Sequence, residues 1–296
     1  MRGQRIAAHD VDQGALMSSY SSKIESLQDA AVRSPEYGAI IPLFVELFRY
    51  LEVAAGQTGI AVNAPQKSLK ENPEHGFPLI SPDSLSIDTA ACSAFLKGAI
   101  SVLSRVGNEG ADDLSKIQEA INAGGLDLKA MFRSILERRR SDIDEAALAI
   151  NVPAALLEYI FEIPLKAALE LFAEGVSTDG LENWTEGCCP VCGSRAGMAE
   201  LAGEEGKRYL CCSACTFRWP FKRLQCPYCE NEEVDKLSYF VADNGATRVD
   251  TCKACSRYIK TRDSRKGNTN VPMDVEDLLT IHLDLLAAKE GFERGK

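Results

Sequence analysis

Cys189-Pro-Val-Cys192 is the first of four Cys-x-x-Cys pairs, and it is followed by Cys212-Ser-Ala-Cys215, Cys226-Pro-Tyr-Cys229 and Cys252-Lys-Ala-Cys255. Successive pairs are separated by 19, 10 and 22 residues. Each half of the region therefore holds two pairs about 20 residues apart, which is the spacing of zinc ribbons and rubredoxins. Two such turns, joined by a hairpin, let four thiolates converge on one ion. The sequence therefore predicts two four-cysteine metal sites.

The residues between the pairs supply the hairpins that this geometry needs. Residues 237–241 are strand-like, Asp243-Asn244-Gly245 predicts a turn, and residues 247–251 return the chain to Cys252. In the first half, residues 203–206 turn the chain and residues 207–210 return it. Because both halves begin with Cys-Pro-x-Cys, we interpret them as a tandem duplication of one small metal module.

The expected metal is zinc or a single iron ion, since both suit tetrahedral thiolate sites. Four thiolates leave no coordination position for the water that a hydrolytic zinc site requires. An iron site would be capable of redox chemistry, and the spacing alone does not choose between the metals. No Ser-His-Asp grouping, phosphate-binding loop or pair of catalytic carboxylates is evident. We therefore expect a protein that is not an enzyme.

The remaining cysteines and the histidines give weaker signals. Of the 11 cysteines, ten fall between Cys188 and Cys255, which in a reducing compartment indicates metal ligation before disulfides. Cys188 and Cys211 each precede a predicted ligand; they are either spare thiols for redox or sulfur chemistry or, as we favour, ordinary cysteines. We expect a core position for Cys92 and a structural role for His282 on the apolar side of the last helix. His9 and His75 carry no signal.

The charge balance argues against a generic nucleic-acid-binding protein. The net charge is −10 and the isoelectric point is about 5.0, whereas a phosphate backbone favours clustered Lys and Arg. Residues 186–266 contain 14 Lys and Arg against 11 Asp and Glu, and the thiolate sites add negative charge. The basic and aromatic segment Arg218-Trp-Pro-Phe-Lys-Arg223 is therefore interpreted as packing that joins the two modules.

The first part of the chain is predicted to be helical, from the spacing of its apolar residues. Residues 61–84 contain four prolines and are expected to form a loop or linker. Residues 153–174 are apolar except for one narrow charged stripe, so we expect a buried central helix, with a partner-binding face as the alternative. Pro164 should kink or split it. Helices are expected over residues 20–34, 41–57, 88–106, 112–123, 126–139 and 142–150.

No membrane-spanning helix or secretory signal is expected. The most apolar segment, residues 153–175, carries five charged residues, and residues 1–14 contain no long apolar run. We therefore expect a cytoplasmic location. After Ser256 come a basic stretch, a linker over residues 267–270 and a last helix from Met273, with Asp274 as its N-cap. The expected domains are 1–183 (helical), 184–222 and 223–270 (four-cysteine modules) and 271–296 (C-terminal helix).

The cysteine-rich region resembles the formate dehydrogenase accessory (formation) proteins. The residues that carry the resemblance are Cys189 to Ser194, Arg208 to Cys212, Cys215 to Trp219, Cys252 to Cys255, Tyr258 to Lys260, Asp277, Leu278, Asp284 and Glu290 to Phe292. Together they span residues 189–292. The N-terminal part of the chain is helical, as in the family, but contains no sharp family motif. One departure is Cys211, where histidine is often expected in the family.

The resemblance implies a multidomain α+β protein, with an all-α N-terminal domain followed by two tandem rubredoxin-like modules and a C-terminal helix. It also implies a non-enzymatic, cytoplasmic role in maturing formate dehydrogenase by binding the molybdenum- or tungsten-containing catalytic subunit. It makes iron at least as well supported as zinc. The alternatives are a zinc-ribbon nucleic-acid-binding protein and a rubredoxin-like electron carrier. Self-association stays open, and no membrane partner is expected.

Overall fold

The computed structural model describes residues 13–33, 35–64, 68–71, 77–107, 110–242, 245–266 and 270–295. His9, His75 and the first two residues of the predicted turn at 243–245 lie outside these ranges. Contacts divide the chain into two units, one made of residues 1–63 and 82–171 and the other of residues 64–81 and 172–296. The expected domain boundaries at 183, 222 and 270 stay a prediction.

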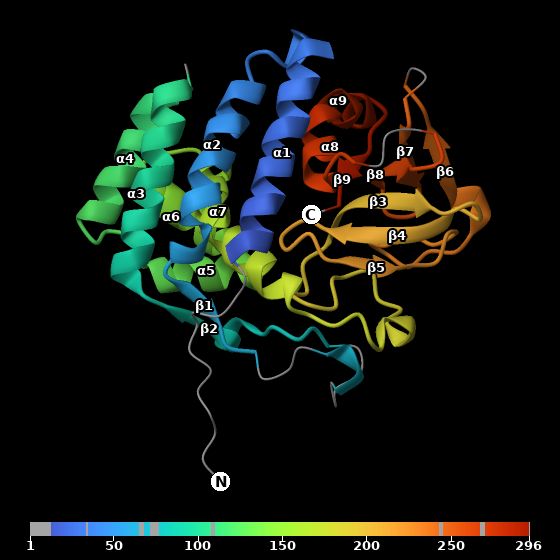
Figure 1. Cartoon of the computed structure of the whole chain (residues 1–296), viewed down its shortest axis with the longest axis horizontal. Coiled ribbons are helices and arrows are strands. Elements are labelled where there is room, and N and C mark those ends of the chain that lie inside the picture. The colour runs from blue at the N-terminus through green and yellow to red at the C-terminus, as the bar shows by residue number, and fades with distance from the viewer. Residues whose placement is uncertain are drawn as a thin grey trace. The chain divides into compact units, whose positions relative to one another are not determined.

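The first unit is a helical bundle with one small sheet. Helices α2 to α7 begin within two residues of their predicted starts, whereas α1 begins at Gln13 rather than residue 20. Figure 1 shows α1, α2 and α3 side by side. Two strands, β1 (Ile60–Val62) and β2 (Leu85–Ile87), pair antiparallel at the two ends of the segment expected to be a loop. The helices are α1 (Gln13–Arg33), α2 (Ile41–Ala54), α3 (Thr89–Val106), α4 (Ala111–Asn122), α5 (Leu128–Leu136), α6 (Arg140–Ala149) and α7 (Ala154–Glu174).

Aspartate side chains fix the starts of two of these helices. Asp88 accepts hydrogen bonds from the backbone N–H groups of Ala90 and Ala91, at 3.0 and 3.1 Å. Asp127 does the same for Lys129 and Ala130. These carboxylates satisfy N–H groups that have no partner within the helix, which sets where α3 and α5 begin.

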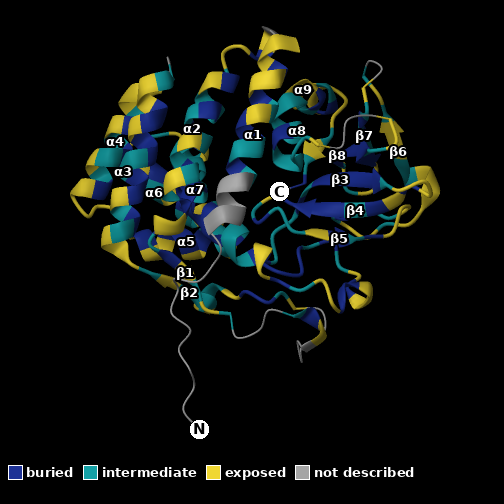
Figure 2. Ribbon diagram, viewed as in Figure 1, coloured by how far each residue is buried: buried dark blue, intermediate teal, exposed yellow. Residues whose placement is uncertain are grey.

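Helix α7 is the buried central helix that its composition predicts: of its residues only Ala155 and Glu174 are in the exposed class, by which Figure 2 is coloured. Leu157, Ile160 and Phe161 are fully buried. Pro164 lies inside an uninterrupted helix, so of the two expected effects the split does not occur, and the kink stays a prediction. The proline removes one backbone hydrogen bond, but apolar packing holds the turns on either side. From the charged stripe, Glu170 pairs with the buried Lys23 at 3.2 Å.

Along the described residues, no single helix is long and apolar enough to cross a membrane. Helices α6 and α7 meet that criterion only jointly, across a bend of 111°.

The second unit is built on one seven-stranded sheet that both metal modules share. The strand order is β5-β4-β3-β8-β7-β6, and β9 pairs with β8. Strands β3 and β8 run parallel, from Met198 opposite Lys260 to Leu201 opposite Asp263, and this ladder joins the two hairpins. The strands are β3 (Ala196–Ala202), β4 (Lys207–Cys212), β5 (Arg218–Pro220), β6 (Leu237–Phe240), β7 (Thr247–Cys252), β8 (Arg257–Asp263) and β9 (Glu293–Arg294).

The basic stretch after Ser256 is a central strand rather than a surface segment. Within β8, Lys260 is 1% exposed and Arg262 is 5% exposed. Arg262 is neutralised by Glu200 at 3.0 Å, and Arg218 contacts the same carboxylate at 2.8 Å. Burial raises the pKa of Glu200, but hydrogen bonds from Ser264 and Arg262 and the charge of Arg218 outweigh it, so the pKa falls below its usual range.

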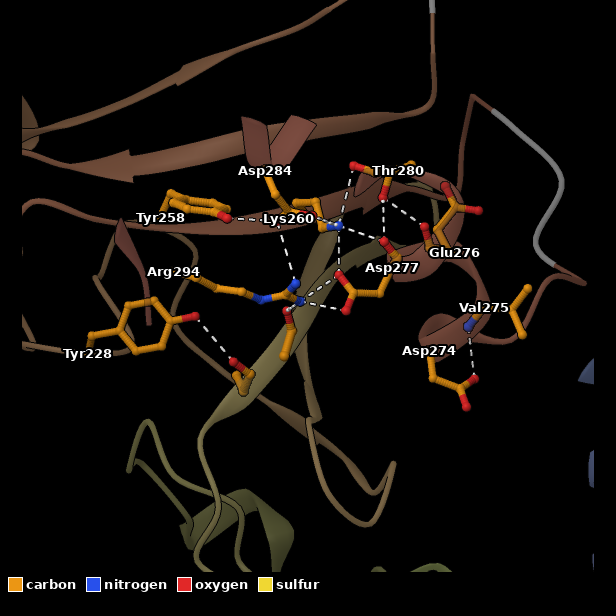
Figure 3. A network of polar contacts seen from close by, with 12 residues as sticks. Tyr228, Tyr258, Lys260, Asp274, Val275, Glu276, Asp277, Thr280, Asp284 and Arg294 are labelled. Atoms are coloured by element: carbon orange, nitrogen blue, oxygen red, sulfur yellow. Dashed lines mark hydrogen bonds and ion pairs between the residues drawn. The ribbon is translucent and has the colours of Figure 1, made fainter. Parts of the chain in front are cut away.

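Lys260 is held in a network of opposite charges, shown in Figure 3. Its Nζ lies 2.8 Å from Asp277 Oδ1 and 2.7 Å from Asp284 Oδ2. Arg294 donates to both oxygens of Asp277, and the Tyr258 hydroxyl donates to Asp284 at 2.7 Å. Two cations therefore balance two carboxylates, and the network ties β8 and β9 to the C-terminal helices.

The predicted C-terminal helix is two helices, α8 (Met273–Leu279) and α9 (Ile281–Lys289). They meet at Thr280, whose hydroxyl donates to the carbonyl of Glu276 at 2.7 Å. This break changes which residues face inward. Leu285 is 63% exposed and His282 is exposed, so their expected places on one apolar face are wrong. The residue at the N-cap of α8 is Pro272 rather than Asp274. The buried residues are Val275, Leu283 and Ala287.

Replacing Lys260 tests whether the charge network stabilises the second unit. Lys260→Met leaves Arg294 alone to balance Asp277 and Asp284, which are partly exposed, so we expect the free energy of unfolding to fall by up to about 3 kcal/mol. Both tryptophans, Trp184 and Trp219, belong to this unit, so fluorescence during urea unfolding reports on it.

The control is Lys222→Met, which removes an exposed ion pair with Glu232. Its expected cost is about 1 kcal/mol or less. Equal effects of the two substitutions would contradict a stabilising role for the network.

Candidate metal centres

The first cluster consists of Cys189, Cys192, Cys212 and Cys215, whose Sγ atoms all lie within 4.8 Å of one another. The shortest separations are 3.4 Å between Cys192 and Cys212, and 3.5 Å between Cys189 and Cys215. Four sulfurs in a tetrahedron around one ion, with bonds of about 2.3 Å, would lie about 3.8 Å apart. The first predicted set of four thiols is therefore brought together with nearly the spacing that a metal requires.

The first cluster is enclosed on all sides. All four of its cysteines are buried, and none exceeds 7% exposure. Part of the cover comes from the segment that was expected to be a linker: the N–H groups of Leu79 and Ile80 donate to the carbonyls of Pro190 and Val191, at 3.0 and 2.9 Å. This pairing explains why residues 64–81 belong to the second unit.

The second cluster consists of Cys226, Cys229, Cys252 and Cys255, also within 4.8 Å of one another. Two separations, Cys226 to Cys255 and Cys229 to Cys252, are both 3.7 Å. Cys226 and Cys252 are buried, but Cys255 is only half-buried and Cys229 is exposed. The second cluster therefore has the spacing of the first and an edge that is open to solvent.

The four cysteine pairs share one backbone feature that sequence inspection missed. The residue after the second cysteine of every pair has positive φ: 72° at Gly193, 57° at Thr216, 60° at Glu230 and 55° at Ser256. This conformation is costly for residues with a Cβ atom. In the turns at Cys189 and Cys226, the N–H of the left-handed residue donates to the carbonyl of the first cysteine, at 2.9 and 3.0 Å. One tight turn thus recurs four times.

The protonation of the first cluster shows why it suits a cation. Burial raises the pKa of Cys189, and hydrogen bonds with the other three thiols lower the pKa of Cys192. Burial of four thiols this close together disfavours several negative charges at once, and a bound cation would allow them to ionise. Backbone N–H groups already point at the sulfurs: Val191 donates to Cys189 Sγ at 3.4 Å and Ala214 to Cys212 Sγ at 3.3 Å. The donor set suits zinc or a single iron ion.

The remaining thiols stay outside both clusters. Cys211 is buried and its Sγ contacts the carbonyl oxygen of Thr216 at 3.4 Å, whereas Cys188 is half-buried. Cys92 is fully buried in α3, as expected, and burial raises its pKa to about 12. Among the described residues, the two clusters are the only groups of three or more His, Cys, Asp or Glu whose ligand atoms converge.

The segment from Arg218 to Arg223 begins with β5, the edge strand of the first module, so its expected role in joining the modules stays a prediction. Trp219 is fully buried, and its Nε1 donates to the carbonyl of Glu186 at 3.2 Å. Elsewhere, a Cβ atom on Gly187 would lie 1.9 Å from the carbonyl oxygen of Pro227 in the second module. The backbones of the two modules are therefore in direct contact there.

Replacing a residue of positive φ by glycine tests whether the turn that follows each cysteine pair is strained. Glu230→Gly should stabilise the second unit by up to about 1 kcal/mol, because glycine adopts positive φ without the Cβ penalty. Glu233→Gly is the matched control, since Glu233 has φ of −68° and gains nothing from glycine. Urea unfolding followed by tryptophan fluorescence measures both. A larger loss from Glu230→Gly than from Glu233→Gly would contradict the strained turn.

Loss of one thiol should remove one ion. Cys226→Ser is expected to lower the metal content from about two ions per chain to about one, because the fold of a small metal module depends on its ion. Elemental analysis by mass spectrometry measures the content. The control is Cys188→Ser, which alters a neighbouring thiol outside both clusters and should retain both ions. Full metal content in the Cys226→Ser protein would eliminate the second site.

Two family models match consecutive stretches of the chain. The model described as "FdhE, central domain" matches residues 188–223, and the model described as "FdhE, C-terminal domain" matches residues 224–296. The border between them falls between the two clusters.

Curated relatives give the same indication. A protein FdhE homolog from Aquifex aeolicus is 37% identical over 141 residues, which are 46% of this chain and 49% of the relative. Homologs from Pectobacterium atrosepticum and Pseudomonas aeruginosa are 36% identical over 110 residues and 30% identical over 154 residues. These alignments cover 36% and 48% of this chain, and 35% and 48% of the relatives. The matches thus span about half or less of each relative.

The fold extends further than the sequence similarity. The crystal structure of the FdhE protein from Pseudomonas aeruginosa aligns with a TM-score of 0.68 and covers 94% of this chain and 93% of its own. The sequence identity over that alignment is 21%. This likeness confirms the expected fold class, in which a helical N-terminal region precedes a sheet-rich region with two four-cysteine clusters.

Proposed function

We propose that this chain is a member of the FdhE family of formate dehydrogenase accessory proteins, and that it assists the biogenesis of a formate dehydrogenase without catalysing a reaction itself. The observation that carries the proposal is the coincidence of the family match over residues 188–296 with two converging groups of four thiols. In this role the protein acts in the cytoplasm and binds the catalytic subunit of the enzyme.

The eight clustered cysteines are the proposed metal ligands, with one ion for each cluster. Cys189, Cys192, Cys212 and Cys215 hold the first ion, and Cys226, Cys229, Cys252 and Cys255 hold the second. Zinc would make both sites structural, and iron would add one-electron redox chemistry. In either case the residues of this chain fold the module around the ion, and four thiolates leave no place for a hydrolytic water.

An electron carrier is the second candidate function. The observation that favours it is the exposed position of Cys229, because electron transfer requires a metal site close to the surface. A role as an electron carrier gives the large helical unit no function, so an accessory function accounts for more of the chain.

Metal analysis with a visible spectrum separates the structural and redox versions. Protein purified without added zinc should contain about two metal ions per chain. Iron with thiolate absorption that bleaches on reduction would support a redox step. Two zinc ions and no colour would exclude the electron carrier. Folded protein without stoichiometric metal would refute the assignment of the ligands.

Binding to the enzyme tests the accessory role directly. We expect the purified protein to bind the catalytic subunit of the formate dehydrogenase from the same organism, measured by biolayer interferometry. Deletion of its gene should lower formate dehydrogenase activity in cells, and the wild-type gene should restore it. Normal activity in the deletion strain together with no binding in vitro would contradict the proposal.

A further inference from the structure

The two clusters lie in different surroundings, although their thiols are arranged alike. The first is enclosed, whereas the second exposes Cys229 and half-exposes Cys255. Large apolar side chains are also exposed around the second cluster, in the segment between Leu224 and Val241. They are Leu224, Val234, Tyr239 and Val241, with exposures of 60%, 64%, 61% and 47%. Strand β6 in this segment is the last strand of the sheet order.

The register of the sheet shows which side chains share a face with the second cluster. Cys252 lies opposite Leu237 on β6 and opposite Arg257 on β8. Asp250, which precedes Cys252 by two residues on β7, lies opposite Tyr239 on β6 and Ile259 on β8. Because side chains two residues apart point to the same side of a strand, these rows form one face. The alternate residues, such as Val249 and Tyr258, pack with Leu283 and Ala287 of α9 in a core cluster.

A cavity of about 100 Å³ lies beside this face, and the buried ligands Cys226 and Cys252 are part of its lining. A space of this size holds several water molecules and is therefore large enough for one carboxylate group.

The cavity is lined by four arginines and one acidic residue, in a chain whose net charge is −10. The acidic residue, Asp250, is already engaged: Arg248 Nε lies 2.7 Å from it and Thr261 donates to it at 2.8 Å. Within the described part of the chain, Arg223 and Arg257 have no carboxylate partner. Even with about two negative charges on a divalent four-thiolate site, the lining keeps a positive balance.

The deepest arginine of the lining, Arg208, is not fully satisfied. Its side chain is 4% exposed, and its Nη1 donates to the carbonyl of Gln225 at 2.7 Å. Its Nε has no hydrogen-bond partner among the described residues, and Asp250 lies 3.9 Å from its Nη2. A buried guanidinium with an unused donor is the kind of group that recognises a carboxylate.

We propose that this cavity and the apolar side chains around it form a docking surface for an acidic, extended segment of a protein partner. A carboxylate of the segment enters the cavity between Arg223 and Arg257, and its apolar residues cover Leu224 and Tyr239. That the partner is a formate dehydrogenase subunit rests on the proposed function. The charge and apolar character of the surface are independent of that function. Charge complementarity and exposed apolar groups beside a sheet edge are typical of such recognition.

The test uses charge reversal at the rim of the cavity, in the full-length protein. The variant is Arg223→Glu with Arg257→Glu. The control, Lys129→Glu with Lys289→Glu, changes the net charge equally at exposed residues that do not line the cavity. Two probes are used: the immobilised catalytic subunit, and a labelled 12-residue peptide of alternating Glu and Leu measured by fluorescence anisotropy. Metal content and melting temperature are measured for every protein.

The rim variant should weaken the binding of both probes by about ten-fold or more, while the control stays within about two-fold of wild type. Unchanged binding of the peptide by a folded, metal-loaded rim variant would overturn the docking surface, and so would the absence of peptide binding by wild type. Displacement of the subunit by an RNA oligonucleotide, or binding only by a second copy of this chain, would also overturn it. If wild type binds the peptide but not the subunit, the proposed function fails and the docking surface stands.

Discussion

The convergence of four thiols at each of two points is the constraint on which the second unit depends. It requires each Cys-x-x-Cys pair to turn tightly enough for both sulfurs to face one centre. The structure meets this with a left-handed residue after every pair, including Thr216, Glu230 and Ser256, where the conformation is unfavourable. The hairpins then bring two pairs together in each module. The residues with unfavourable backbone conformation therefore lie in the turns that position the sulfur atoms.

The modules do not stand apart, because the parallel ladder between β3 and β8 merges their hairpins into one sheet. That ladder places β8 in the interior together with its cationic side chains. Lys260 and Arg262 are buried only because Asp277, Asp284 and Glu200 lie within ion-pair distance. The carboxylates that neutralise Lys260 come from α8 and α9. The C-terminal helices are thus part of the structure that supports the metal region.

The two four-cysteine sites have similar geometry in unequal surroundings. Residues 77–81 cover the first cluster by pairing with the turn at Pro190 and Val191, whereas Cys229 of the second is exposed. The arginine-lined cavity and the exposed apolar residues occur beside the second cluster. The enclosed first site and the accessible second site are therefore the structural basis for the docking surface proposed beside Cys229.

The sequence by itself determined the eight clustered cysteines, the two hairpin modules and the helical unit with its buried α7. These follow from short-range spacing, since cysteine pairs and helical periodicity are local properties of the chain. Only the tertiary structure decided the burial of β8, the break at Thr280, the exposure of His282 and the cavity beside Cys226. Each of these depends on partners distant in sequence, such as Glu200 with Arg262. A buried Lys or Arg looks like a surface residue until the carboxylate that neutralises it is located in space.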